Sequence, residues 1–173
     1  MEHPLVSFYL NKSSTPEGYT LEEIWGWGHE NLEYTHTYIQ WLFPLREKSN
    51  FNLSAPTIDD NAIREFSTNQ QLHENLIKSF RIMLNFYGFT LDDKGGKVVI
   101  NKAPDFEEKK TYWLNPYNHN FLRITRILTS LTLLGCKEYA AALLLCLNGL
   151  RDKYHHDISE NTFNYWNNAV KIG

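Results

Sequence analysis

The sequence predicts an all-α fold: a compact bundle of about six helices with one small β-hairpin near residues 90–101. Three observations favour this class. Apolar residues recur at helical spacing over long stretches, capping residues stand where these stretches begin, and only one short segment changes to a β-branched pattern. Because 173 residues suit one ordinary domain, we expect residues 1–173 to form a single helical domain.

The first long helix is expected over residues 21–43. It begins with a capping box, in which the Thr20 hydroxyl accepts a backbone N–H bond while Glu23 reaches back to the cap. Two glycines near its start weaken it, and Pro44 cannot continue it. A short helix is expected from Thr57 to near Ser67.

The remaining chain predicts four further helices, one before the hairpin and three after it. An apolar stripe from Leu72 to Tyr87 indicates a helix that ends at Gly88, where a left-handed C-cap fits. The hairpin follows, because turn residues precede a β-branched run. Later helices are expected over residues 115–134, 137–154 and 159–170, and the second of these is apolar nearly all round, which predicts a central buried position.

Two stripes of polar residues carry the candidate functional site. At 100° per residue, one edge of the 21–43 helix holds Glu22, His29, Glu33, His36 and Gln40, and the opposite flank carries Trp27, Tyr34, Tyr38 and Trp41. The 115–134 helix has a matching stripe of His119, Arg123, Arg126 and Ser130. Because that opposite flank is aromatic, we expect protein to cover the 21–43 helix on most sides and to enclose the polar stripe partly, which makes the stripe more informative than an exposed one.

Three functions are compatible with these stripes. In the first, the arginines only bridge carboxylates or helix ends inside the protein, because buried charges must be paired. In the second, a groove between the stripes binds a peptide or a small anionic ligand. The third is a metal-dependent or acid-base enzyme centred on Glu33 and His36, for which a second Glu-x-x-His copy is missing. The candidate ligand-binding residues are His29, Glu33, His36, Gln40, Trp41, His119, Arg123 and Arg126.

The composition restricts the class of partner and the compartment. Net charge is −3, and Glu107 and Glu108 stand beside Lys109 and Lys110, so no nucleic acid is expected as partner. No apolar run is long enough for a transmembrane segment, and we expect an intracellular, cytoplasmic protein with two free thiols. No nucleotide, metal or nucleophile motif is present, so the sequence predicts no enzyme, no metal and no cofactor.

Three ordered blocks carry a family resemblance. They are Leu32 to Glu47, with the core Tyr-Ile-Gln-Trp-Leu-Phe-Pro-Leu; Met83-Leu84-Asn85-Phe86-Tyr87-Gly88; and His119 to Leu131, with Leu-Arg-Ile-Thr-Arg-Ile-Leu at its centre. Together they resemble the conserved domain of the opioid growth factor receptor family over roughly residues 8–170. We expect a stand-alone copy of that domain.

The resemblance implies a receptor-like binding module. Animal members of the family are described as receptors, outside the G-protein-coupled class, for the opioid peptide Met-enkephalin; they are associated with the nucleus and restrain cell growth. A peptide ligand, a protein partner, and a nuclear or nuclear-envelope location are therefore implied. The motif match covers His36, Gln40, His119, Arg123 and Arg126, and the resemblance supplies no catalytic residues.

Overall fold

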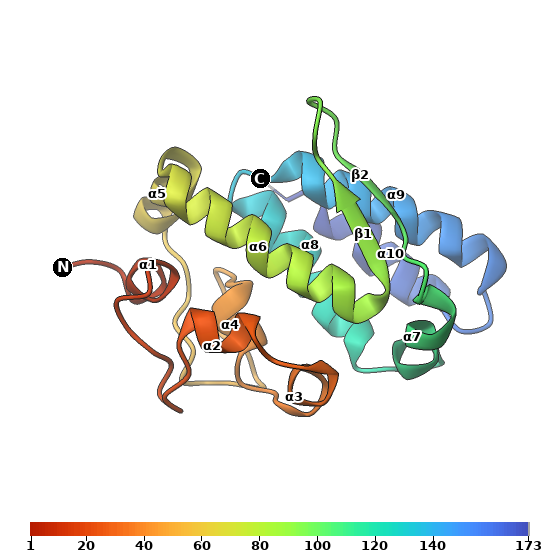
Figure 1. Ribbon diagram of the computed structural model, residues 1–173, viewed down its shortest axis with the longest axis horizontal. Coiled ribbons are helices and arrows are strands. Elements are labelled where there is room, and N and C mark those ends of the chain that lie inside the picture. The colour runs from red at the N-terminus through yellow and green to blue at the C-terminus, as the bar shows by residue number, and fades with distance from the viewer. Residues whose placement is uncertain (173) are drawn as a thin grey trace. The chain divides into compact units, whose positions relative to one another are not determined.

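The computed structural model describes residues 1–172 and confirms the mostly helical class, with a single two-stranded hairpin among these residues (Figure 1). Ten helices are found in this part of the chain, where about six were expected. Two short helices, α1 (Pro4–Tyr9) and α7 (Phe106–Trp113), were not anticipated. The chain divides into two compact units, Met1–Ile82 and a second that begins at Met83.

The segment 21–43, expected as one helix, forms three: α2 (Leu21–Trp25), α3 (His29–Tyr34) and α4 (Ile39–Leu42). The capping box is present at the start of α2. Gly28 is extended and begins α3, and Thr35 is extended and ends it, so the ladder is interrupted twice. Across the second break the Tyr38 hydroxyl donates to the Leu32 carbonyl oxygen at 2.8 Å, and this bond supports an interruption that helix propensity did not predict.

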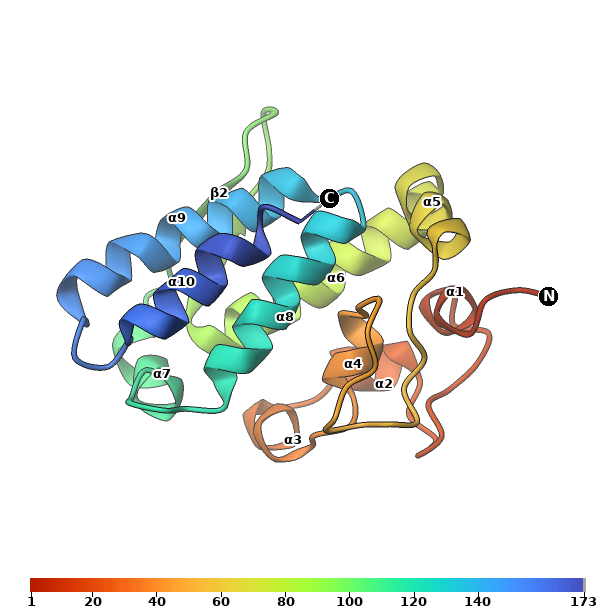
Figure 2. The same cartoon turned by 180° about the vertical axis from the view of Figure 1, so that it is seen from behind.

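The first unit also contains α1, α5 (Asp60–Thr68) and the start of α6 (Gln70–Tyr87). The cap of α5 is Asp59, whose carboxylate accepts from the Ala62 N–H at 2.8 Å; Thr57 had been expected in that role. The Tyr9 side chain joins three elements in the core. Its ring contacts Phe66 of α5, and its hydroxyl donates to the Leu42 carbonyl oxygen at 2.6 Å. Helices α1 and α5 lie side by side (Figure 2).

The second unit is a layer of helices with the hairpin against one of them. α8 (Asn120–Leu133), α9 (Lys137–Lys153) and α10 (Glu160–Ala169) lie side by side (Figure 2). The Trp166 indole N–H donates to the Phe121 carbonyl oxygen at 3.2 Å, which fixes α10 on α8. α8 begins five residues later than expected, because Tyr117 has a φ of 62° and cannot be helical.

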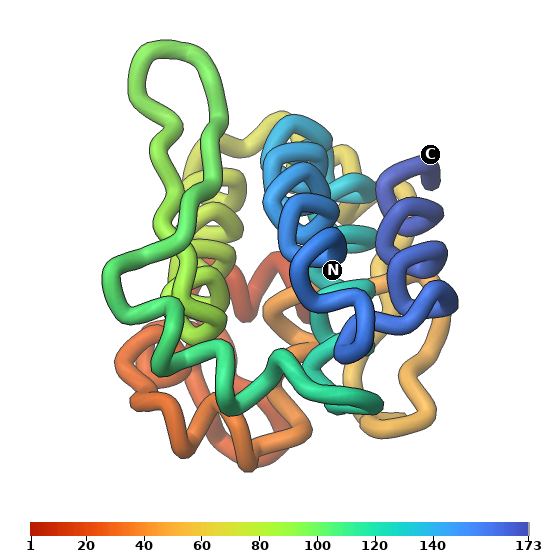
Figure 3. The backbone as a smooth tube through the Cα atoms, turned by 90° about the vertical axis from the view of Figure 1, so that its right-hand side faces the viewer, coloured from red at the N-terminus to blue at the C-terminus, as the bar shows by residue number. Residues whose placement is uncertain are grey.

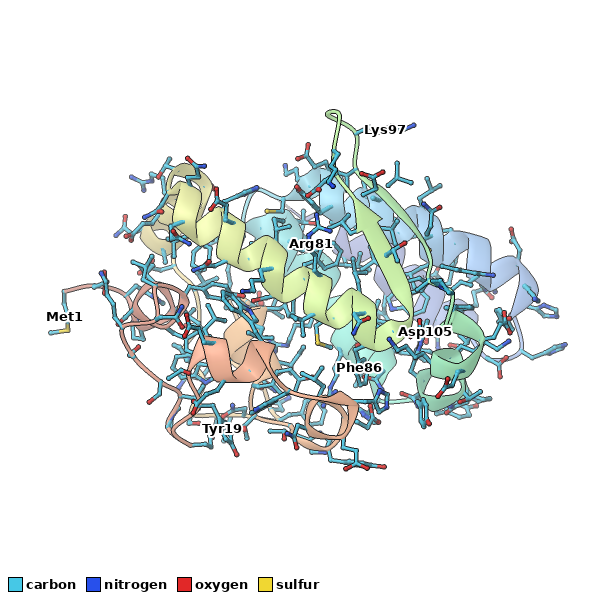
Figure 4. The ribbon with its side chains drawn as sticks, in the orientation of Figure 1. Met1, Tyr19, Arg81, Phe86, Lys97 and Asp105 are labelled. Carbon is cyan, nitrogen blue, oxygen red and sulfur yellow. The ribbon has the colours of Figure 1, made fainter. Side chains whose placement is uncertain are left out.

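The hairpin is confirmed as β1 (Phe89–Asp92) and β2 (Val99–Lys102), paired antiparallel with Leu91 opposite Ile100. It lies along α9, and its turn extends beyond that helix (Figure 3). Lys97 projects from the turn, while Asp105 stands at the start of α7 (Figure 4). The left-handed Gly88 that was expected after α6 is confirmed, with a φ of 89°.

Three other expectations concern burial, the cysteines and the membrane. α9 was predicted to be buried on nearly all sides, but its Leu145 is 75% exposed, so this prediction was wrong for one face. Cys136 and Cys146 are free thiols, as expected. None of the helices in residues 1–172 is long and apolar enough to cross a bilayer.

Candidate ligand-binding residues

The candidate residues of the first unit come from three different elements. His29 and Glu33 lie one turn apart on α3, Gln40 and Trp41 belong to α4, and His36 stands in the extended connection between them. The single helical stripe expected here is therefore wrong, because residues 21–43 do not share one helix axis. Only His29 and Glu33 keep the i, i+4 relation.

The break also separates Glu33 from His36. α3 ends at Tyr34, Glu33 is 9% exposed, and His36 is exposed on the connection. An i, i+3 pair directs two side chains to one metal only when both stand on one helix. No cluster of three or more His, Cys, Asp or Glu side chains placed to hold a metal is found in residues 1–172.

Gln40 and Trp41 bring unsatisfied polar atoms into the interior of the first unit. Each side chain is 5% exposed. The Gln40 Oε1 acceptor and the Trp41 Nε1 donor have no hydrogen-bond partner among the described residues. A buried polar group without a partner costs about 1–3 kcal/mol, so such a group in a native fold requires an explanation. A ligand that supplies a donor and an acceptor would satisfy both.

The cationic stripe of the second unit follows α8 as expected from Arg123 onward. Arg123 is 6% exposed, Arg126 is half-buried and Ser130 is fully buried. His119 directly precedes the helix and is exposed. The Ser130 hydroxyl is buried without a hydrogen-bond partner in residues 1–172, one turn beyond Arg126.

Asn120 is the residue that the sequence argument missed. It is fully buried, and its side-chain oxygen accepts from the Arg123 guanidinium at 3.5 Å and from the Tyr87 hydroxyl at 3.4 Å. Its Nδ2 lies 3.5 Å from the His119 ring nitrogen Nε2. The available signal was its place three residues before Arg123, since residues at that spacing face each other on a helix. Asn120 therefore links two candidate residues within one unit.

The lysines beside the acidic residues of α7 are ion-paired. Lys109 Nζ lies 2.8 Å from Asp105, and Lys110 pairs with Glu107 while also donating to the Tyr154 hydroxyl at 3.0 Å. The bond from Lys110 lowers the pKa of Tyr154, and the bond to Glu107 raises the pKa of Lys110. Lys109 and Lys110 are therefore paired with carboxylates of the second unit itself.

The fold and these residues define a mostly helical domain whose aromatic interior holds a few buried polar side chains. Residues 2–172 match the family described as opioid growth factor receptor (OGFr) conserved region. The chain belongs to this family, and the resemblance seen in its sequence blocks is confirmed.

Individual relatives agree with this assignment. An opioid growth factor receptor-like protein 1 of Xenopus tropicalis is 42% identical over 141 residues, covering 79% of this chain and 27% of that protein. The opioid growth factor receptor of Rattus norvegicus is 40% identical over 143 residues, 80% of this chain and 24% of its own length. The chain thus spans about a quarter of the curated relatives it matches. No solved structure matches it significantly.

Proposed function

We propose that this domain is a receptor-like binding module for a peptide or a small anionic ligand, and that its two units act as one functional domain. Relatives that carry the receptor name are 38–40% identical to this chain over most of its length. The observation that carries the proposal is the buried pair of unsatisfied atoms on Gln40 and Trp41, which a polar ligand would complete.

Each candidate residue has a chemical role in this proposal. Arg123 and Arg126 bind a carboxylate, for which the guanidinium fork is suited. Gln40 and His36 form hydrogen bonds to the ligand's polar part, and Trp41 adds contact area and a donor. His29, Glu33 and His119 stand next to these groups in the chain and would contact an amino or amide group.

The proposal also includes an intracellular place of action, cytoplasmic or nuclear. It is supported by the two free thiols, since cysteines stay reduced inside cells. The nuclear part of the proposal rests on the family resemblance alone. Fractionation of cells that express the tagged chain tests both parts, and a purely extracellular location would contradict them.

Titration calorimetry with Met-enkephalin and with its C-terminal amide tests the proposed carboxylate contact. The two probes differ only at the carboxyl end, so we expect the amide to bind on the order of 10- to 100-fold more weakly, the range of a lost charge-assisted bond. Equal binding of both peptides would exclude the arginine contact. No binding of either peptide would exclude this peptide class and leave small organic anions for the same assay.

Variants then separate ligand contacts from structural ones. Arg123→Gln and Arg126→Gln should weaken binding of the acid peptide but not of the amide, whereas the exposed Arg64→Gln should change neither. Gln40→Leu removes the unsatisfied amide, so we expect it to raise the melting temperature while weakening binding. If it weakens stability and leaves binding unchanged, Gln40 is a structural residue.

The alternative to a ligand-binding module is a structural protein-interaction domain without a ligand site. It predicts that Arg123→Ala lowers stability while no peptide or anion raises the melting temperature of the unaltered chain. Thermal melts at increasing probe concentration distinguish the two, because any ligand of the native state must stabilise it.

A further inference from the structure

The outward face of α9 is uncharged at its centre. Within the second unit α9 contacts α8, α10 and β2, and its remaining face is exposed. Ala141, Leu145 and Gly149 follow one another along this face at intervals of four residues and are all exposed. Leu145, at the middle, is 75% exposed. A single exposed leucine is ordinary on a protein surface, so what distinguishes this face is the arrangement of charges around the uncharged stripe.

Both ends of the same face carry charges of opposite sign. Lys137 and Glu138 stand in the first turn of α9, and Asp152 and Lys153 stand in its last turn, all exposed. They lie at nearly equal distances before and after Leu145. At 100° per residue, Lys137 and Asp152 fall on one flank of the face and Glu138 and Lys153 on the other. The charge pattern is therefore complementary to itself when the helix is reversed.

We propose that α9 is a self-association surface through which two copies of this chain pair antiparallel, about a twofold axis at Leu145. Leu145 of one copy then contacts Leu145 of the other, with Ala141 and Gly149 small enough for close approach. Lys137 faces Asp152 of the second copy, and Glu138 faces Lys153. The reversed helix dipoles also favour this direction, and a twofold axis makes the contact self-complementary.

The size of the surface sets the expected strength. α9 has 17 residues and is about 25 Å long, so one helix pair buries less area than a standard stable interface. We therefore expect a weak dimer whose population depends on concentration.

Sedimentation equilibrium of the full chain over a concentration series provides the first test. The unaltered protein should show a monomer–dimer equilibrium, and Leu145→Asp should weaken dimerisation at least about 10-fold. The matched control is Leu122→Asp, since Leu122 of α8 is also exposed, at 58%; it should leave dimerisation unchanged. Circular dichroism verifies that both variants fold. A chain that stays monomeric throughout, or a dimer that tolerates Leu145→Asp, would overturn the proposal.

Charge exchange tests the direction of pairing. Lys137→Glu alone should weaken the dimer, and adding Asp152→Lys should restore it, because the pair is re-formed with its charges exchanged. A parallel pair would place Lys137 beside Glu138 of the second copy, so Lys137→Glu with Glu138→Lys would restore it. Restoration by that second combination alone would overturn the antiparallel arrangement.

Discussion

The Arg123 guanidinium lies 3.5 Å from the side-chain oxygen of Asn120, one turn earlier on α8. The same oxygen accepts from the Tyr87 hydroxyl at the end of α6, so a single fully buried amide serves a candidate ligand-binding residue and a core tyrosine. Buried polar networks of this kind fix the direction of each member. Asn120 is therefore placed to hold Arg123 in position.

Asn120→Ala is expected to lower the free energy of unfolding by about 1–3 kcal/mol, because two buried donors lose the acceptor that they share. Urea denaturation measures this change. The control is Asn164→Ala on the exposed side of α10, for which a change within about 0.5 kcal/mol is expected. Combined with Tyr87→Phe, the Asn120 loss should be less than additive; strict additivity would show that the two side chains act independently.

Tyr9→Phe tests the link between α1 and α4. The fully buried Tyr9 hydroxyl donates to the Leu42 carbonyl oxygen, and its removal should lower the free energy of unfolding by about 1–2 kcal/mol. Tyr34 is 76% exposed, so Tyr34→Phe should have almost no effect. Equal effects of the two changes in chemical denaturation would contradict the importance of this bond.

The capping box of α2 should be visible in a pH titration. The Thr20 backbone N–H and hydroxyl donate to the Glu23 carboxylate, and these bonds lower the pKa of Glu23. Because the pKa is lowered in the folded state, the stabilisation exists above the ordinary pKa of Glu and is lost as the pH falls through the lowered one. Thr20→Ala should raise the pKa of Glu23 toward its ordinary value, as measured by NMR, and lower stability by about 1 kcal/mol. An unchanged pKa would contradict the contribution of the Thr20 hydroxyl.

The sequence predicted the fold where local signals and tertiary contacts agree. The apolar stripe ending at Tyr87 and the left-handed Gly88 predicted the end of α6, and the structure confirms both. The β-branched run predicted a strand, and most of it lies in β2. The 21–43 segment was mispredicted because its apolar spacing suits one helix, whereas it breaks at Gly26 to Gly28, whose glycines had only been expected to weaken the helix, and again after Tyr34, where a side chain bonds to the backbone. That bond, from Tyr38 to Leu32, cannot be read from residue spacing.

The candidate site was predictable in residue type but less so in arrangement. Arg123 and Arg126 both lie on α8, so the helical spacing that the sequence predicted for these two side chains is present in the structure. In the first unit the expected stripe crossed the break after Tyr34, so burial diverged: Gln40 is buried and His36 exposed. Asn120 was overlooked because a short amide carries no charge pattern, and its importance comes from its burial and its hydrogen bonds with Arg123 and Tyr87.

The two cysteines predict a loss of stability in alkali. Burial raises the pKa of Cys136 from 9.0 to about 12 and that of Cys146 to about 11, with a smaller contribution from Glu138 at Cys136. Because the folded state holds these protons more tightly, the stabilisation is complete below the ordinary thiol pKa and is lost as the pH rises through the raised values. Melting temperatures should fall over that range, and Cys136→Ala should flatten the decline. If the melting temperature of Cys136→Ala falls as steeply with rising pH as that of the unaltered chain, the buried Cys136 thiol is not a cause of the decline.

Two glycines in helical surroundings should respond oppositely to alanine. Gly88 has a φ of 89°, and a Cβ built there would lie 2.9 Å from the Phe106 Cα atom and 3.2 Å from the Lys109 Cβ atom. Gly88→Ala therefore combines left-handed strain with a backbone clash, and we expect a loss of at least about 2 kcal/mol in the free energy of unfolding.

Gly149 lies inside α9, where a Cβ would meet nothing within 4 Å. Gly149→Ala should thus stabilise the chain by about 0.5–1 kcal/mol, because alanine loses less conformational entropy in a helix. Urea denaturation at low protein concentration, where the proposed α9 pairing does not contribute, compares the two, and a loss of similar size at both positions would refute the difference in their surroundings.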